Sequence, residues 1–191
     1  MKHIIKNTLA IVICLVGFSQ PVFSQGAGIE WDILNQEVVR LYKEANYSKA
    51  ILIAEQALNV AKENVGRDHP DVATSLNNLA GLYEAQGNYS KAEPLYKRSL
   101  AIREKALGPD HPSVAISLNN LAGLYYAQGN YSKAEPLYKR SLAIWEKAFG
   151  SDHPSVATIL ENMAFLYRST NRKSDAIKLE KRAKEIRNIK R

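Results

Sequence analysis

Cysteine is almost absent from this sequence of 191 residues, in which Cys14 is the only one. A disulfide bond within one chain needs two thiols, so the fold cannot depend on such a crosslink. The sequence also lacks the GxSxG motif of serine hydrolases, the P-loop of nucleotide-binding proteins and the HExxH motif of zinc proteases. We therefore expect a protein that is not an enzyme and that uses no cofactor or metal.

Long apolar runs are also missing. The longest covers residues 8–18 and has 11 residues, whereas a membrane-spanning helix needs about 20. Lys2 and Lys6 precede this run and small residues follow it, which is the pattern of a secretory signal. We predict a signal peptide over residues 1–24 with cleavage after Ser24, and hence a periplasmic or secreted protein. An uncleaved membrane anchor, or a lipid attached to the single cysteine, is the alternative.

Acidic residues are fewer than basic ones: 19 Asp and Glu stand against 26 Lys and Arg, a formal net charge of +7. A basic protein can bind nucleic acid or an anionic membrane. Export argues against nucleic acid as the partner, and removal of the signal lowers the charge from +7 to +5, because two lysines leave with it. Residues 178–191 are strongly basic, which predicts either a solvated outer helix face or weak contact with anionic lipid.

The dominant feature of the sequence is an internal repeat. Residues 88–102 (NYSKAEPLYKRSLAI) return unchanged at residues 130–144, 42 positions later. Between residues 88–129 and residues 130–171, 30 of 42 positions are identical. Self-similarity at a fixed period is typical of repeat architectures, in which each unit packs against its neighbours.

Turn residues divide each unit into two helices, which we call the A helix and the B helix. Gly87 and Gly129 follow an A helix, where a residue that tolerates positive φ ends the helix well. Pro70, Pro112 and Pro154 suit the first turn of the next A helix. We predict A helices near residues 29–44, 70–86, 112–128 and 154–170, and B helices near residues 48–65, 89–107, 131–149 and 173–189. Residues 25–28 are predicted to be a flexible lead.

Serine and glutamate recur three positions apart at the start of the B helices. Ser90 with Glu93, and Ser132 with Glu135, predict capping boxes. In a capping box both side chains bond the first backbone N–H groups of the helix, so these glutamates are interpreted as structural residues and not as a catalytic pair.

Three histidines, His69, His111 and His153, recur in the sequence Asp-His-Pro at a spacing of 42 residues. Metal ligands must lie about 2 Å from one centre, whereas equivalent loops of stacked helix pairs lie roughly 10 Å apart. The histidines therefore predict a ladder that fixes loops and helix starts, and no metal site.

The A helix near residues 70–86 has two distinct faces when its residues are spaced at 100°. The side expected to be buried carries Leu76, Leu79, Ala80 and Tyr83. The opposite side is small, weakly polar and rich in amides, and it carries Thr74, Asn77, Asn78, Gly81, Glu84 and Ala85. The same side of the next A helix carries Ile116, Asn119, Asn120, Gly123, Tyr126 and Ala127.

The segments LNNLAGLY, GNYSKAEPLYKRSLAI and GPDHPSVA resemble the tetratricopeptide repeat (TPR) family, and the 42-residue unit resembles its kinesin light chain subclass. The resemblance covers residues 29–191 and implies an all-α, right-handed solenoid of about four antiparallel helix pairs. The repeats are expected near residues 29–69, 70–111, 112–153 and 154–191. The first unit reads LYKEANY where the second reads LYEAQGNY, so its turn is expected to be one residue shorter.

The resemblance also implies a non-catalytic scaffold or adaptor that binds a peptide or protein surface in a concave groove. In peptide-binding members of the family, the matching A-helix positions line that groove. The candidate groove residues are Asn77, Asn78, Gly81, Glu84, Asn119, Asn120, Gly123, Tyr126 and Asn162. The middle repeats offer no Lys or Arg at these positions, which predicts a ligand of neutral or mixed charge.

Other interpretations of the sequence stay open. The asparagine face can be an ordinary solvated surface. The chain can be a self-assembling structural module whose open ends stack, or a membrane-surface adaptor that uses its basic C-terminal helix. The identity of the partner is not encoded in any motif that we find.

Overall fold

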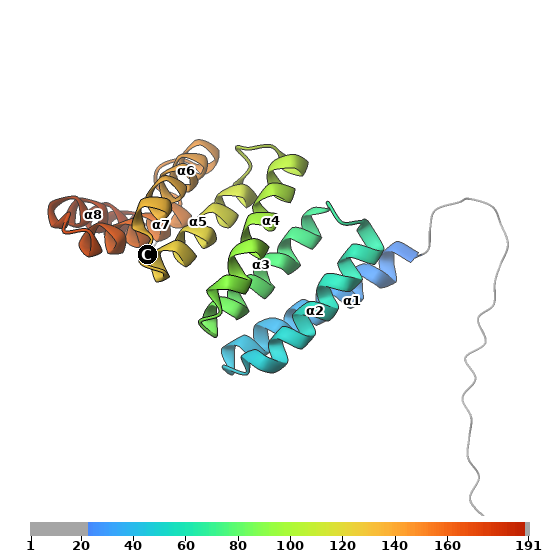
Figure 1. Ribbon diagram of the computed structural model, residues 1–191. Coiled ribbons are helices and arrows are strands. Elements are labelled where there is room, and N and C mark those ends of the chain that lie inside the picture. The colour runs from blue at the N-terminus through green and yellow to red at the C-terminus, as the bar shows by residue number, and fades with distance from the viewer. Residues whose placement is uncertain (1–22, 190–191) are drawn as a thin grey trace, which may run out of the picture.

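The computed structural model describes residues 23–189, and this part of the chain consists of eight α-helices in four antiparallel pairs (Figure 1). The helices are α1 (Phe23–Lys43), α2 (Tyr47–Val65), α3 (Pro70–Ala85), α4 (Tyr89–Leu107), α5 (Pro112–Ala127), α6 (Tyr131–Phe149), α7 (Pro154–Ser169) and α8 (Lys173–Ile189). The odd-numbered helices are the predicted A helices and the even-numbered ones are the B helices. The predicted all-α solenoid of four helix pairs is confirmed.

The bounds of α2 to α8 differ from the prediction by at most one residue at either end. The exception is α1, which begins at Phe23, so residues 25–28 are helical and the predicted flexible lead is wrong. The sequence of α1 contains no proline that would break the helix. The helix is therefore continuous from Phe23, through residues 25–28, to the part that packs on the neighbouring helices. Residues 1–22 lie outside the described part of the chain, and the signal peptide stays a prediction.

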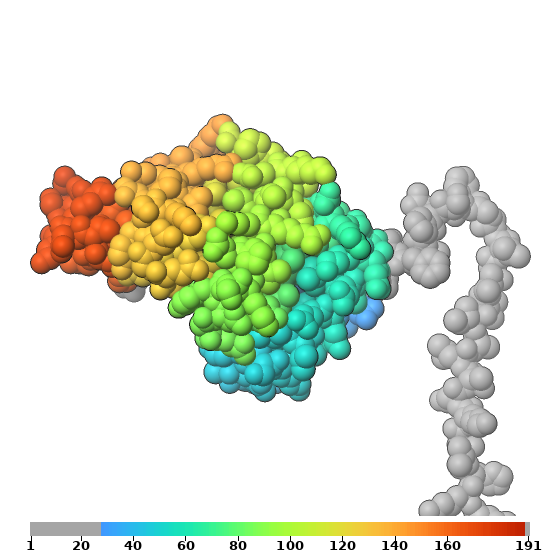
Figure 2. Space-filling model, viewed as in Figure 1, coloured from blue at the N-terminus to red at the C-terminus, as the bar shows by residue number. Residues whose placement is uncertain are grey.

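The four pairs follow one another along the molecule, from α1 and α2 at one end to α7 and α8 at the other (Figure 1). Each B helix packs on the A helix before it and, in the first three repeats, on the A helix after it. The space-filling view shows the same order as successive bands of colour along the chain (Figure 2). Stability in such a stack is the sum of contacts between neighbours, because distant repeats do not touch.

Small residues let the two helices of a pair lie close together. Ala80 of α3 and Ala92 of α4 are fully buried in one core cluster. Nearby, the buried hydroxyl of Ser99 donates a hydrogen bond of 2.7 Å to the backbone oxygen of Ala73, which ties α4 to α3. The arrangement recurs 42 residues later with Ala122, Ala134, Ser141 and Ala115.

The turn between α1 and α2 corrects one expectation. In all four pairs, a backbone N–H after the A helix bonds the carbonyl oxygen five residues earlier, which is the Schellman arrangement. The four bonds link Asn46 to Leu41, Asn88 to Tyr83, Asn130 to Tyr125 and Arg172 to Tyr167, at 2.7–2.9 Å. The first turn is therefore as long as the others. The LY pair at residues 41–42 suggested a deletion because it lies one position out of register with the LY pair at 82–83.

The predicted capping boxes are wrong. The N-cap residues of α4 and α6 are Asn88 and Asn130, and neither helix has a side-chain cap. Because α4 begins at Tyr89, Ser90 lies inside the helix and not at its N-cap, and the Ser90 hydroxyl instead donates to the side-chain oxygen of Asn88 at 3.1 Å. Glu93 instead accepts a hydrogen bond of 2.9 Å from the Tyr125 hydroxyl, and so joins α4 to α5.

The predicted role of the three histidines at the helix starts is confirmed. His69, His111 and His153 are the N-cap residues of α3, α5 and α7. The Nδ1 atom of each accepts a hydrogen bond of 3.1–3.2 Å from the backbone N–H two residues later. Within residues 23–189, no group of three or more His, Cys, Asp or Glu side chains is arranged to hold a metal ion.

The residue that ends each A helix has a left-handed backbone, and its identity varies. Gly87 has a φ of 73°, whereas Ala45 has a φ of 54° at the equivalent point. A Cβ atom in this region costs about 1 kcal/mol. Replacing Ala45 with Gly should therefore raise the free energy of unfolding by about 0.5–1 kcal/mol, after allowance for the entropy of glycine in the unfolded chain. Urea unfolding followed by circular dichroism measures this change.

Two matched variants complete this test. Gly87→Ala should lower the free energy of unfolding by a similar amount. Ala101→Gly, at an exposed position well inside α4, should also lower it, since glycine weakens a helix interior by about 1 kcal/mol. If Ala45→Gly destabilised the protein as Ala101→Gly does, the turn would not be strained.

Candidate peptide-binding groove

The asparagines of the A helices form a ladder that connects all four repeats. The side-chain N–H of Asn78 donates to the Asn35 oxygen at 3.0 Å, across the α3–α1 contact. The same bond joins Asn120 to Asn77 at 3.1 Å and Asn162 to Asn119 at 3.0 Å. Each bond spans 43 residues, one repeat plus one position, so a single geometry is repeated three times.

The ladder fixes the orientation of amides that keep further hydrogen-bonding capacity. A side-chain amide has two N–H donors and an oxygen with two lone pairs. Each bond in the ladder uses one donor of one residue and one lone pair of the next. The asparagines are only partly buried, so solvent or a ligand reaches them. The A-helix face is therefore a row of oriented amides that can bond an extended peptide backbone.

An apolar hollow opens beside the ladder at its N-terminal end. Its volume is about 400 Å³, and its lining includes Val39, Tyr42, Asn77, Asn78, Gly81 and Asn120. A second hollow of about 390 Å³ adjoins it and shares Val39 and Asn78. Val39 and Tyr42 of α1 are each about half exposed, 49% and 50%. Amides and exposed apolar side chains thus lie side by side on this face.

A carboxylate lies at the edge of the same face. Glu84 of α3 accepts a hydrogen bond of 2.8 Å from the hydroxyl of Tyr96, which is on α4. Burial raises the pKa of Glu84, and the hydrogen bond from Tyr96 opposes this change. Gly81 lies beside this hydrogen bond, and a Cβ atom there would be 3.4 Å from the Tyr96 hydroxyl, the lower limit of ordinary van der Waals contact.

A buried arginine joins the second and third repeats. Arg103 of α4 donates to the hydroxyl of Ser117 at 2.9 Å and to the hydroxyl of Thr74 at 3.2 Å. Burial lowers its pKa, and these two hydroxyls and the backbone oxygen of Ser113 accept three hydrogen bonds from its guanidinium. The equivalent position 42 residues later is Trp145, which lies with Ile116 at a small hollow of about 150 Å³.

The family model described as tetratricopeptide repeat matches residues 40–105, 78–147 and 113–189, which together span most of the chain. The chain is a tetratricopeptide repeat protein. Its 42-residue units are of the kinesin light chain type, as the sequence predicted.

Solved structures similar to this TPR protein agree with that assignment. The crystal structure of BtubC (BKLC) from P. vanneervenii has 26% sequence identity and a TM-score of 0.76, and the match covers 88% of this chain and 67% of that one. A putative kinesin light chain from Podosopora anserina with nearly identical TPR-like repeats has 26% identity and a TM-score of 0.72, over 82% and 74% of the two chains. A comparison with curated protein sequences finds no match.

The predicted groove residues of this TPR protein divide into two groups. The five asparagines meet in the ladder, and Gly81 lies in the hollow beside it. Tyr126 lies apart from the hollow, and its hydroxyl contacts the Ser169 hydroxyl at 3.1 Å. Gly123 occupies the equivalent place one repeat later, where a Cβ atom would lie 3.7 Å from the Tyr138 hydroxyl, an ordinary van der Waals distance.

Sequence reasoning missed three residues of this TPR surface. Asn35 begins the ladder, and the 42-residue period from Asn77 would have identified it if the first turn had been counted at full length. Val39 and Tyr42 had no such signal, because the hollow that they line depends on how α1 lies against α3.

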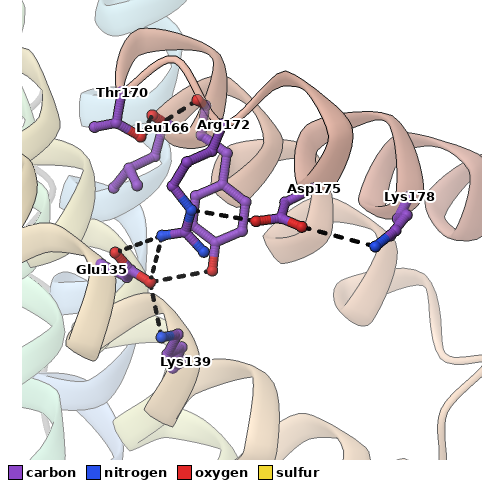
Figure 3. A network of polar contacts seen from close by, with 8 residues as sticks. Glu135, Lys139, Leu166, Thr170, Arg172, Asp175 and Lys178 are labelled. Atoms are coloured by element: carbon purple, nitrogen blue, oxygen red, sulfur yellow. Dashed lines mark hydrogen bonds and ion pairs between the residues drawn. The ribbon is translucent and has the colours of Figure 1, made fainter.

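The last TPR repeat is fastened to the third by a charged network (Figure 3). Glu135 of α6 accepts from Lys139 at 2.7 Å, from Arg172 at 3.0 Å and from the Tyr167 hydroxyl at 3.2 Å. The Arg172 guanidinium also lies 3.7 Å above the Tyr167 ring. The Lys139 ammonium, with help from Arg172, holds the pKa of Glu135 at about 2, although burial acts in the opposite direction.

This network predicts a pH-dependent contribution to stability. A carboxylate with a depressed pKa stabilises the fold above its usual value of 4.5, and the contribution is lost as the pH falls towards about 2. Glu135→Gln should therefore lower the free energy of unfolding at pH 7 by about 1 kcal/mol or less, and the difference from wild type should shrink between pH 4.5 and 2. Urea titrations across this range provide the measurement.

The control is Glu63→Gln, which changes an exposed glutamate of α2 that has no ion-pair partner within residues 23–189. It should leave stability unchanged at every pH. A Glu135→Gln difference that did not vary with pH would mean that the carboxylate charge does not act in this network.

Proposed function

We propose that this TPR protein is an exported, non-catalytic adaptor that binds a peptide segment or protein surface in the groove on its A helices. The TPR fold is generally a protein–protein interaction scaffold. The observation that carries the proposal is the asparagine ladder, since it presents oriented amides at one repeated spacing. Export rests on the signal-like sequence of residues 1–24.

The groove favours a particular kind of ligand. Its amides suit the backbone of an extended chain, which needs both donors and acceptors. The hollow beside Val39 and Tyr42 suits an apolar side chain. Lys43 borders this hollow and Glu84 lies one turn beyond Gly81, so both signs of charge are present. A ligand of mixed charge with one large apolar residue fits these features.

Self-assembly by stacking of the open ends has less support. Leu100 and Leu142 are partly buried where one repeat meets the next. The equivalent residue on the last helix is Lys184, which is exposed. A lysine at this point suits a solvated terminal repeat and not a further stacking contact.

The basic C-terminal helix gives equally limited support to a membrane-surface role. Lys178, Arg182 and Arg187 pair with carboxylates of this chain. Lys181 and Lys184 of α8 have no such partner within residues 23–189. The described helices include none that is long and apolar enough to cross a membrane.

Substitution of the ladder tests the groove. Asn78→Ala combined with Asn120→Ala removes two inter-repeat hydrogen bonds together with the amides offered to a ligand. We expect partner capture to fall about tenfold and the free energy of unfolding to fall by about 1–2 kcal/mol. A matched control, Ser99→Ala with Ser141→Ala, removes two buried hydrogen bonds outside the groove and should reduce stability similarly while capture is kept.

Photo-crosslinking in the native compartment measures capture. A benzophenone amino acid replaces Tyr126, an aromatic residue on the A-helix face, and the control probe replaces Ala143, which is exposed on α6. The groove is supported by a discrete adduct from position 126 that the asparagine variant loses and the serine variant retains. Adducts only from position 143, or losses that merely follow stability, would reject the groove as the binding surface.

A further inference from the structure

Two successive contacts between B helices contain the same ionic clamp. Arg140 of α6 donates to the Glu104 carboxylate of α4 at 2.6 Å and to the backbone oxygen of Pro109 at 3.1 Å. One repeat later, Arg182 of α8 donates to the Glu146 carboxylate at 2.6 Å and to the backbone oxygen of Ser151 at 3.3 Å. In each case the guanidinium bridges the preceding B helix and the loop that follows that helix.

The first contact of this series, between α2 and α4, has the arginine but lacks the carboxylate. Arg98 of α4 lies 42 residues before Arg140, and Lys62 stands where Glu104 would be. Arg67 occupies the loop position equivalent to Pro109. Two cationic side chains, Arg98 and Lys62, therefore share the position at which the next two contacts pair opposite charges, and Arg67 adds a third in the adjoining loop. None of the three has a hydrogen-bonded or ion-paired carboxylate within residues 23–189.

The pKa of Lys62 reflects the closeness of the other two cationic side chains. The pKa of Lys62 is lowered, first by partial burial and then by the charges of Arg98 and Arg67. The acidic residue of the adjoining loop, Asp68, is held by the Lys105 ammonium at 2.7 Å, and the more distant charge of Arg98 adds to the lowering of its pKa. Arg98 is exposed, whereas Arg140, which has its glutamate, is partly buried. The cluster is thus a place where a negative charge from outside would remove repulsion.

The cluster is also open to a ligand. Arg98 is exposed and Lys62 is only partly buried, and Arg67 lines an open hollow of about 730 Å³ that the α2–α3 loop forms with Ala106 of α4. This surface belongs to the B helices and their loop, whereas the asparagine ladder belongs to the A helices. Occupation of one surface therefore does not require the other.

We propose that Lys62, Arg67 and Arg98 form a second binding site, which takes the carboxylate of an Asp or Glu side chain of a protein partner. The chemistry of the ligand follows from the repeat itself, because the equivalent positions beside Arg140 and Arg182 hold a glutamate carboxylate. The planar guanidinium of Arg98 matches the two oxygens of a carboxylate, and the Lys62 ammonium adds a further donor. The partner thus supplies the carboxylate that, in the next two contacts, comes from a glutamate of this chain.

In the test, the peptide acetyl-Gly-Glu-Glu-Gly-amide is titrated into the isotope-labelled full chain. Binding is monitored through the NMR chemical shifts of the protein's backbone amides. We expect saturable shifts near Lys62, Arg67 and Arg98. The control peptide, in which glutamine replaces both glutamates, should cause none. Lys62→Glu supplies the missing carboxylate within the chain. It should weaken peptide binding about tenfold or more and, by creating the ion pair, raise the melting temperature.

The matched control is Lys181→Glu, which makes the same change of charge at an exposed lysine of α8 and should keep the affinity. Equal losses in the two variants would mean diffuse attraction by net charge and would overturn the site. Shifts outside the cluster, the absence of saturation, or a lower melting temperature for Lys62→Glu would overturn it too.

Two further titrations test the choice of ligand and the independence of this site from the groove. Inorganic phosphate that saturates the cluster while the glutamate peptide does not would reject the carboxylate assignment. The Asn78→Ala and Asn120→Ala variant should bind the glutamate peptide as wild type does. A loss in that variant would mean that the peptide occupies the groove and would reject a separate site.

Discussion

The structure depends on the close approach of the A and B helices at small side chains. Ala80 and Ala92 have no exposed surface, and the Ser99 hydroxyl reaches a backbone oxygen of α3 at 2.7 Å. A larger side chain at any of these points would push the two helices apart, since packed interiors leave no room for added volume. The same spacing recurs one repeat later. The core therefore fixes where each A helix lies relative to the next.

The amide ladder is a consequence of that regular spacing. Bonds of 3.0–3.1 Å between asparagines 43 residues apart form only if successive A helices keep one separation and one rotation. The polar groups inside the stack are equally constrained: among the described residues, no buried side-chain nitrogen or oxygen lacks a hydrogen-bond partner. A surface held in this way loses little conformational entropy when a ligand binds, which favours affinity.

The sequence predicted the helices well because the period, the turn glycines and the first-turn prolines all agree on the same bounds. It failed at the capping boxes, which required Ser90 at the N-cap, whereas the helix begins one residue earlier and its N-cap is Asn88. The hydrogen bonds of the ladder were not predicted for a different reason: the asparagines were interpreted as contacting a ligand and not each other. The hollow at Val39 depends on the packing of α1 on α3, which no local pattern encodes.

Differences between nearly identical repeats carry the information that the shared residues cannot. One A-helix position is Glu84 in the second repeat, Tyr126 in the third and Arg168 in the fourth, and each finds its own partner: the Tyr96 hydroxyl, the Ser169 hydroxyl and the Glu180 carboxylate. The scaffold is thus uniform in packing, whereas the side chain at this one position differs in size, charge and partner from repeat to repeat. A ladder of identical amides cannot by itself distinguish the two directions of a bound chain. Different side chains at equivalent points of the same face can, because a peptide with unlike ends gains favourable contacts in only one orientation.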